Sequence, residues 1–134
     1  MKAIEHIGIA VNDIEEAVKT YERLLDTECY KREVVEEQKV DTAFFRTGPS
    51  KVELLGATAE DSVIAKYLSK QGEGMHHVAF EVEDIRAEME RLGQEGFTLL
   101  SEEPMHGADN KLVAFVHPKD NHGVLVELCQ TIKE

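Results

Sequence analysis

Apolar residues alternate with small or polar ones over residues 3–11, which are rich in Ile and Val. A period of two is typical of a half-buried strand. From Ile14 to Leu25 the apolar spacing becomes helical, and the preceding Asn12 or Asp13 is of a type that caps helix N-termini. Three more strand patterns follow, so the first part of the chain is expected to run β-α-β-β-β. These strands are expected at residues 28–35, 40–47 and 51–56.

The second part of the chain shows the same order of patterns. A strand pattern over 76–82 precedes apolar residues at helical spacing from Ile85 to Leu92, and Gly93 or Gly96 is expected to end that helix. Three strands are again expected to follow the helix. They are expected at residues 97–101, 111–117 and 123–130.

A sequence repeat supports the duplication of one module. EHIGIAVNDI at 5–14 aligns with HHVAFEVEDI at 76–85, and KVELLGA at 51–57 aligns with LVELCQT at 125–131. We therefore predict an α+β fold of two paired βαβββ modules that form a curved, barrel-like mixed sheet around a concave pocket. The predicted organisation is a single domain over 1–134, with module 1 at about 1–56, a connector at about 57–74 carrying a helix from about Asp61 to Lys70, and module 2 at about 75–134.

Each module places one His and one Glu on the strand face directed away from its helix, because side chains alternate along a strand. These residues are His6 and Glu53 in module 1, and His77 and Glu127 in module 2. A lone His or Glu on a strand is usually structural or solvated, but repetition of both favours a shared ligand set. The repeat selects His77 over its neighbour His76. Two imidazoles and two carboxylates suit a divalent metal such as Co, Ni, Mn, Zn or Mg.

Composition narrows the class of protein without identifying its chemistry. The 134 residues include 15 Lys and Arg against 27 Asp and Glu, a formal net charge of −12. Without a basic stripe, this charge argues against binding to nucleic acid or anionic membranes. No apolar run approaches the roughly 18 residues that span a bilayer, and an acidic residue comes too early for a signal peptide. Because Cys29 and Cys129 form no CxxC motif or disulfide framework, we expect a cytoplasmic protein.

Six segments of both modules and the connector form distinctive motifs: EHIGIAV at 5–11, VELL at 52–55, EDSVIAKYLSK at 60–70, GEGMHHVAFEV at 72–82, AFVHPK at 114–119 and GVLVELC at 123–129. With the order His, Glu, His, Glu, they resemble the vicinal oxygen chelate superfamily and, within it, the methylmalonyl-CoA epimerase family. The resemblance covers essentially the whole chain. HPK followed by GVLVEL is its part most specific to the epimerases.

The resemblance implies an isomerase that interconverts the two epimers of methylmalonyl-CoA at the carbon between thioester and carboxylate. It implies one divalent metal ion held by His6, Glu53, His77 and Glu127. It also implies a CoA thioester as the small-molecule partner and a homodimer as the assembly. In some relatives the second ligand is Gln, and Glu53 would make the site more negative.

Carboxylates are expected to carry the proton in this reaction. We predict that Glu127 is a metal ligand that also acts as a base. Glu53 is the candidate for the proton carrier on the opposite face of the substrate carbon. Some epimerases place a Glu base on the third strand, but the ungapped register puts Thr42 there. Asp41 would need a shift of one residue to point inward, which a strand resists. The second base is left open between Glu53, Asp41 and another group.

Other functions stay open at this stage. A glyoxalase I-like lactoylglutathione lyase uses a similar metal set, but such enzymes typically have a DPDG-type turn where this chain has HPKDNHG at 117–123. Non-catalytic binding modules of the superfamily keep the fold without the ligands, and a purely structural repeat protein is a further alternative. Because CoA is polyanionic, Lys111 and Lys119 are candidates to meet its phosphates or the substrate carboxylate, with solvated surface lysines as the alternative.

Overall fold

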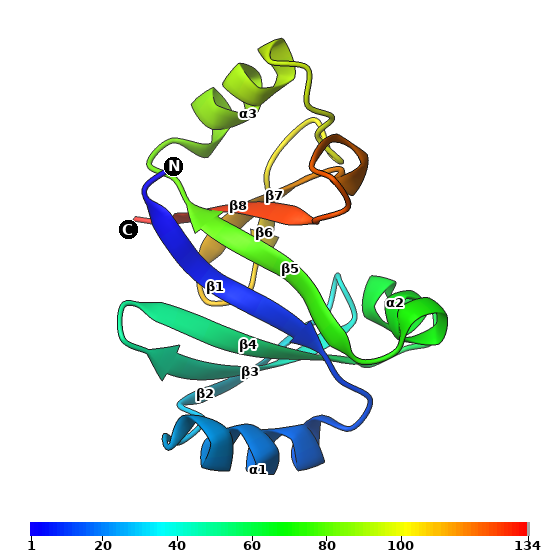
Figure 1. The fold of residues 1–134 in the computed structure, drawn as a ribbon. Coiled ribbons are helices and arrows are strands. Elements are labelled where there is room, and N and C mark those ends of the chain that lie inside the picture. The colour runs from blue at the N-terminus through cyan, green and yellow to red at the C-terminus, as the bar shows by residue number, and fades with distance from the viewer. Residues whose placement is uncertain (134) are drawn as a thin grey trace. The chain divides into compact units, whose positions relative to one another are not determined.

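A computed structural model describes residues 1–133 of the chain, and it contains the order β-α-β-β-β twice with one helix between (Figure 1). The predicted α+β class with two βαβββ modules is therefore confirmed. The first module comprises β1 (Ala3–Ala10), α1 (Ile14–Leu25), β2 (Lys31–Val35), β3 (Val40–Thr47) and β4 (Ser50–Ala57), and α2 (Val63–Gln71) follows it. The second comprises β5 (Gly74–Glu81), α3 (Ile85–Gln94), β6 (Met105–Gly107), β7 (Lys111–Val116), the 3₁₀ turn η1 (Pro118–Asp120) and β8 (Val126–Thr131).

The chain divides into two compact units, which we describe separately. Unit 2 is His6–His76, and unit 1 combines Met1–Glu5 with the residues from His77 onward. The start of β1 thus belongs with the second module, and the backbone N–H of Lys2 donates a hydrogen bond of 2.8 Å to the carbonyl of Glu81 in β5.

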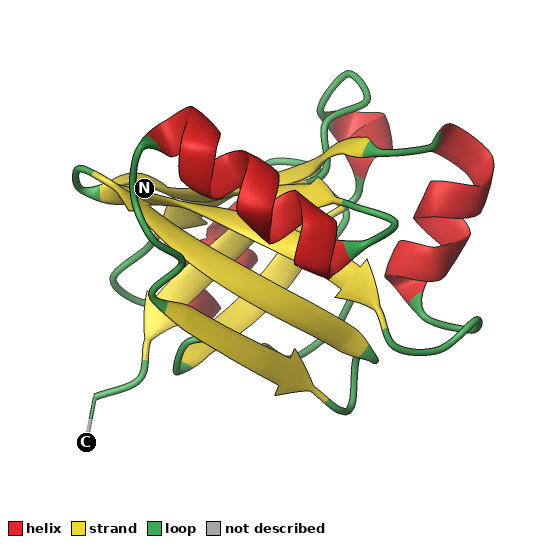
Figure 2. Ribbon diagram, turned by 90° about the horizontal axis from the view of Figure 1, so that it is seen from below, coloured by secondary structure: helices red, strands yellow, loops and turns green. Residues whose placement is uncertain are grey.

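The strands of unit 2 are ordered β2-β3-β4-β1, and β1 runs parallel to β4 while the other pairs are antiparallel. Figure 2 views the molecule from the side of α1, which covers one face of these strands. Of the two predicted capping residues, Asn12 and Asp13, it is Asp13 that caps this helix, since its side chain accepts a hydrogen bond from the N–H of Glu16. The half-buried apolar side of α1 packs on a core of buried strand residues, which are Val11, Ala43, Phe45, Val52 and Leu54.

The opposite face of unit 2 is covered at one end by α2. Ile64 of α2 is buried against Ala10, Val40 and Leu55, one residue from each of three adjacent strands. Ser62 caps the helix by accepting a hydrogen bond of 3.0 Å from the N–H of Ala65. His6 and Glu53 lie on the same face, closer to the start of β1 and β4 than Ala10 and Leu55, which α2 covers.

The strands of unit 1 are ordered β5-β8-β7-β6, with β5 parallel to β8 and the other pairs antiparallel. The amphipathic helix α3 packs on one face of them. The buried core on this side consists of Val82, Ile85, Met89, Leu92, Ala114, Val116 and Leu128. Within residues 1–133, no helix has the length and apolar character needed to cross a membrane.

The predicted strand over 97–101 is wrong. Leu99 forms only an isolated bridge to Val116. Besides its pairing with β8, β7 pairs with β6 at Met105–Gly107. Phe97 and Leu99 are apolar because they pack against the α3 core, which the alternation pattern does not distinguish from a sheet ladder.

The last strand also begins later than residue 123, the predicted start. Gly123 has φ of 91°, and its N–H donates a hydrogen bond of 2.9 Å to the carbonyl of Pro118. That turn occupies the residues before β8 and delays the strand to Val126. Glycine is favoured here because other residues rarely adopt a positive φ.

Candidate metal centre

The first half of the candidate site lies in unit 2, on the sheet face opposite α1. Nδ1 of His6 lies 3.1 Å from Oε2 of Glu53, and these residues are only 4% and 6% exposed. Gly8 of β1 is the register partner of Glu53, and its lack of a side chain leaves room for both groups above the sheet. The parallel pairing of β1 and β4 thus brings together two residues far apart in sequence.

The second half of the site lies in unit 1 and repeats this arrangement. Nε2 of His77 lies 3.2 Å from Oε1 of Glu127, and these residues are 7% and 5% exposed. The small residue Ala79 is the register partner of Glu127 in the parallel pair of β5 and β8. The ring of Phe115 meets the His77 imidazole edge-on at a centroid distance of 5.9 Å, which fixes an apolar wall beside it.

These two pairs fit the donor chemistry of a divalent metal. Imidazole nitrogen and carboxylate oxygen suit the borderline and harder divalent ions, and both bind in their deprotonated forms. In each unit the carboxylate already lies against the imidazole, so the donor atoms are held near each other within the fold. A protein that only needed a core would fill these buried positions with apolar side chains.

The register of β3 separates the two further candidates for a base. Oδ2 of Asp41 accepts a hydrogen bond of 2.9 Å from Arg32, which also contacts Glu15 of α1 at 3.0 Å. Asp41 therefore lies on the side of the sheet that α1 covers. Thr42 lies on the opposite face with Glu53, and it is 1% exposed.

The remaining histidines have other surroundings. His76 packs edge-on against Tyr67 of α2 at a centroid distance of 4.9 Å. His117 caps η1, since its Nδ1 accepts a hydrogen bond of 3.0 Å from the N–H of Lys119, and His122 lies in the following turn. His106 lies on β6 and is exposed.

The two lysines proposed to meet CoA lie in unit 1. Nζ of Lys111 donates a hydrogen bond of 2.7 Å to Oγ1 of Thr131, and Lys119 is exposed on η1. Neither lysine is buried, so both can be reached by solvent.

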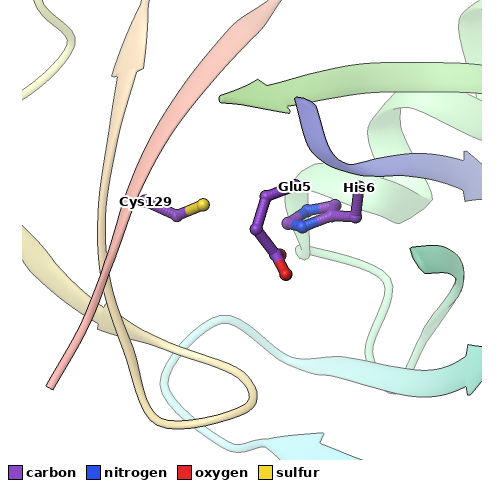
Figure 3. Close-up of side chains that lie close together, drawn as sticks. All are labelled: Glu5, His6 and Cys129. Atoms are coloured by element: carbon purple, nitrogen blue, oxygen red, sulfur yellow. The ribbon is translucent and has the colours of Figure 1, made fainter. Parts of the chain in front are cut away.

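Sequence reasoning missed two buried charged residues near the candidate ligands. Lys51, 6% exposed, lies on the same face of β4 as Glu53, and the alternation pattern contained that signal. Glu5 is 9% exposed, and one of its carboxylate oxygens lies within 4.8 Å of Sγ of Cys129 in unit 1 (Figure 3). Alternation within β1 gave no sign of Glu5, because the first residues of that strand belong to unit 1 rather than unit 2.

The fold and the repeated His–Glu pairs define a class of protein that sequence comparison identifies. The sequence model that represents the Glyoxalase/Bleomycin resistance protein/Dioxygenase superfamily matches residues 5–115. The chain belongs to this superfamily.

Within the superfamily, the chain is similar to proteins named as methylmalonyl-CoA epimerases. The ethylmalonyl-CoA/methylmalonyl-CoA epimerase of Cereibacter sphaeroides is 41% identical over 129 residues, covering 95% of this chain and 96% of the relative. The human mitochondrial methylmalonyl-CoA epimerase is 41% identical over 128 residues, covering 95% of this chain and 73% of the relative. A solved structure of a methylmalonyl-CoA epimerase in complex with methylmalonyl-CoA and NH4+ has a TM-score of 0.94 and 39% identity, covering 98% of this chain and 95% of that one. The resemblance carried by the motifs is confirmed.

Proposed function

We propose that this protein is a methylmalonyl-CoA epimerase that inverts the configuration at C2 of the acyl group. The observation that carries the proposal is the buried His–Glu pair found once in each unit, His6 with Glu53 and His77 with Glu127. Relatives that carry this activity in their names, and that are similar over nearly the whole chain, support the same reaction.

We propose further that the two pairs together hold one divalent ion, with Co, Ni, Mn, Zn and Mg as the candidates. Two donors from one unit are too few for a stable site, and the second unit offers the same two. When bound, such an ion supplies Lewis-acid chemistry, which draws charge toward the thioester oxygen and makes the C2 proton easier to remove.

Carboxylates of the chain carry the proton in this mechanism. Glu127 accepts the C2 proton on one face, so the C–H bond breaks and its electron pair stays with the acyl group. Glu53 would enter this direction of the reaction as the carboxylic acid, protonated by solvent and not bound to the ion. It donates that proton to the opposite face of C2, where the retained electron pair forms the new C–H bond, and Glu53 is left as a carboxylate. The reverse reaction exchanges the two roles.

The surroundings of each pair limit access of water. Phe44, fully buried, is the cross-strand partner of Glu53, and Phe115 lies beside His77. Apolar walls next to carboxylates strengthen the electrostatic interactions that stabilise charge in the transition state.

We also propose a homodimer located in the cytoplasm. The assembly is supported by the resemblance to the epimerase family. The location is supported by Cys29 and Cys129, neither of which forms a disulfide within the described residues, as expected in a reducing compartment.

An assay with one purified epimer of methylmalonyl-CoA tests the proposal. Protein loaded with each candidate metal in turn should convert it to the mixture of epimers. Parallel reactions with the hemithioacetal of glutathione test the glyoxalase I-like alternative. Conversion of the hemithioacetal together with inert methylmalonyl-CoA would replace the epimerase proposal with that alternative.

A further inference from the structure

Lys51 is a buried cation within the candidate site of unit 2. It is 6% exposed, and it precedes Glu53 by two residues on β4, so both side chains leave the same face. In the parallel pairing of β1 and β4, the register partner of Lys51 is His6. Lys51 therefore lies next to both members of the His6–Glu53 pair.

A buried lysine in this place requires a reason, because lysine is almost never fully buried unless it is paired with an acid. Lys51 has at least one polar or electrostatic interaction within the protein. An ammonium carries three N–H donors and no acceptor. It can therefore serve an acceptor of the protein and a carboxylate of a ligand at the same time.

Other cations on this face are placed differently. Arg46 is the cross-strand partner of Lys51 but is exposed, and its guanidinium lies 4.3 Å from the centroid of the Tyr30 ring. Lys31 is only partly buried and lies 3.2 Å from Glu33. Of these three cations, Lys51 is the buried one, and it is on the strand that carries Glu53 and in register with His6, whereas Arg46 is on β3 and Lys31 on β2.

We propose that Lys51 recognises the free carboxylate of the acyl group and makes the site specific for malonyl-type thioesters over neutral acyl thioesters. This inference rests on the proposed function, because it concerns the same substrate. The acyl groups of methylmalonyl-CoA and propionyl-CoA differ by that carboxylate alone. A charged hydrogen bond to it distinguishes the two thioesters at the point where they differ.

Calorimetric binding of methylmalonyl-CoA and propionyl-CoA to wild type and to Lys51→Met tests the proposal. The substitution should weaken methylmalonyl-CoA binding by about 10- to 100-fold, as expected for one charged hydrogen bond, and should change propionyl-CoA binding by less than about twofold. Lys51→Arg, which keeps the charge, should retain most of the preference. Lys19→Met on α1, at a lysine whose side chain is 74% exposed, is the matched control and should change neither.

Equal weakening of both thioesters by Lys51→Met would overturn the proposal, because a purely structural counter-ion has that effect. Unchanged binding of both would overturn it as well. If Lys51→Met does not fold, wild type still decides the matter. Measured with a chelator present, wild type should prefer methylmalonyl-CoA by at least about tenfold. If removal of the metal by the chelator abolished the whole preference for methylmalonyl-CoA, the preference would be due to the ion and not to Lys51.

These outcomes are distinguishable from failure of the proposed function. A protein that prefers methylmalonyl-CoA through Lys51 but does not epimerise it contradicts the reaction and leaves this inference standing. A protein that epimerises normally, with the preference unchanged in Lys51→Met, contradicts this inference alone.

Discussion

Nδ1 of His6 and Oε2 of Glu53 lie 3.1 Å apart, although the residues come from different strands and neither is exposed by more than 6%. The same relationship joins Nε2 of His77 to Oε1 of Glu127 at 3.2 Å. The ring nitrogen in contact differs between the two pairs. Each pair therefore repeats the residue types of the other while leaving a different imidazole nitrogen outside the contact.

A chelator should lower the stability of metal-loaded protein. Metal that binds only the folded state, at a free concentration of about 100 times its dissociation constant, adds about 2.7 kcal/mol to the free energy of unfolding. Thermal unfolding with and without the chelator measures this difference. Identical Tm values for metal-loaded and chelator-treated protein would contradict a structural bond between metal and chain.

His6→Ala and His77→Ala should each weaken metal binding by more than about 100-fold, since loss of outer hydrogen-bonding partners alone costs 10- to 100-fold in metal sites. Direct metal titration measures the affinities. His106→Ala, at an exposed histidine of β6, is the control and should bind metal as wild type does. If only one of the two variants lost affinity, the metal would belong to one unit alone.

Asp120 should make the protein sensitive to acid through its hydrogen bond to Thr98. The N–H of Thr98 donates a bond of 2.7 Å to Oδ2 of Asp120, which lowers the pKa of that carboxyl below its ordinary 3.8. A lowered folded-state pKa adds stability that is present above the unfolded value and is lost as the pH falls through the folded value. Asp120→Ala should therefore be less stable than wild type at about pH 7, and the gap should narrow below about pH 4.

Urea unfolding at a series of pH values measures that gap. Asp120→Asn, which keeps an oxygen acceptor but does not titrate, separates the charge from the hydrogen bond. A gap between wild type and Asp120→Ala that stays constant down to about pH 2 would contradict the assignment.

Leu54→Ala should destabilise the protein by about 2–5 kcal/mol, because it opens a cavity beneath α1. Leu54 is fully buried in the core of unit 2. Leu24→Ala, at a position 68% exposed on α1, should stay within about 0.5 kcal/mol of wild type. Denaturant unfolding compares the two, and equal losses would mean that α1 is not packed as described.

The sequence predicted the elements best where local signals agreed with tertiary packing. The helix of Ile14–Leu25 and the strand of Val40–Thr47 have the predicted bounds, because capping and alternation act locally. The strand predicted at 97–101 was wrong because Phe97 and Leu99 are apolar in order to pack against the α3 core. Apolar residues in a loop that packs on a core can alternate as they do in a strand, so the pattern did not separate the two cases.

The candidate site shows the same division. Repeat and alternation placed His6 and Glu53 on one face, and the structure brings their side chains into contact. Lys51 had the same alternation signal, but a charged residue next to a turn is usually solvated, so its burial depends on tertiary structure. Glu5 gave no local signal, because its neighbour Cys129 comes from the far end of the chain.

The most direct test of the proposed chemistry is incubation of metal-loaded protein with one epimer of methylmalonyl-CoA in deuterated buffer, monitored by mass spectrometry and by chiral analysis. Wild type should place one solvent deuteron at C2 and yield both epimers. Glu127→Gln that still binds metal should be slower in the exchange by about 10²–10⁴-fold, the range expected for a lost acid or base. Full exchange by that variant would contradict the role of Glu127, and no exchange by metal-loaded wild type would contradict the epimerase function itself.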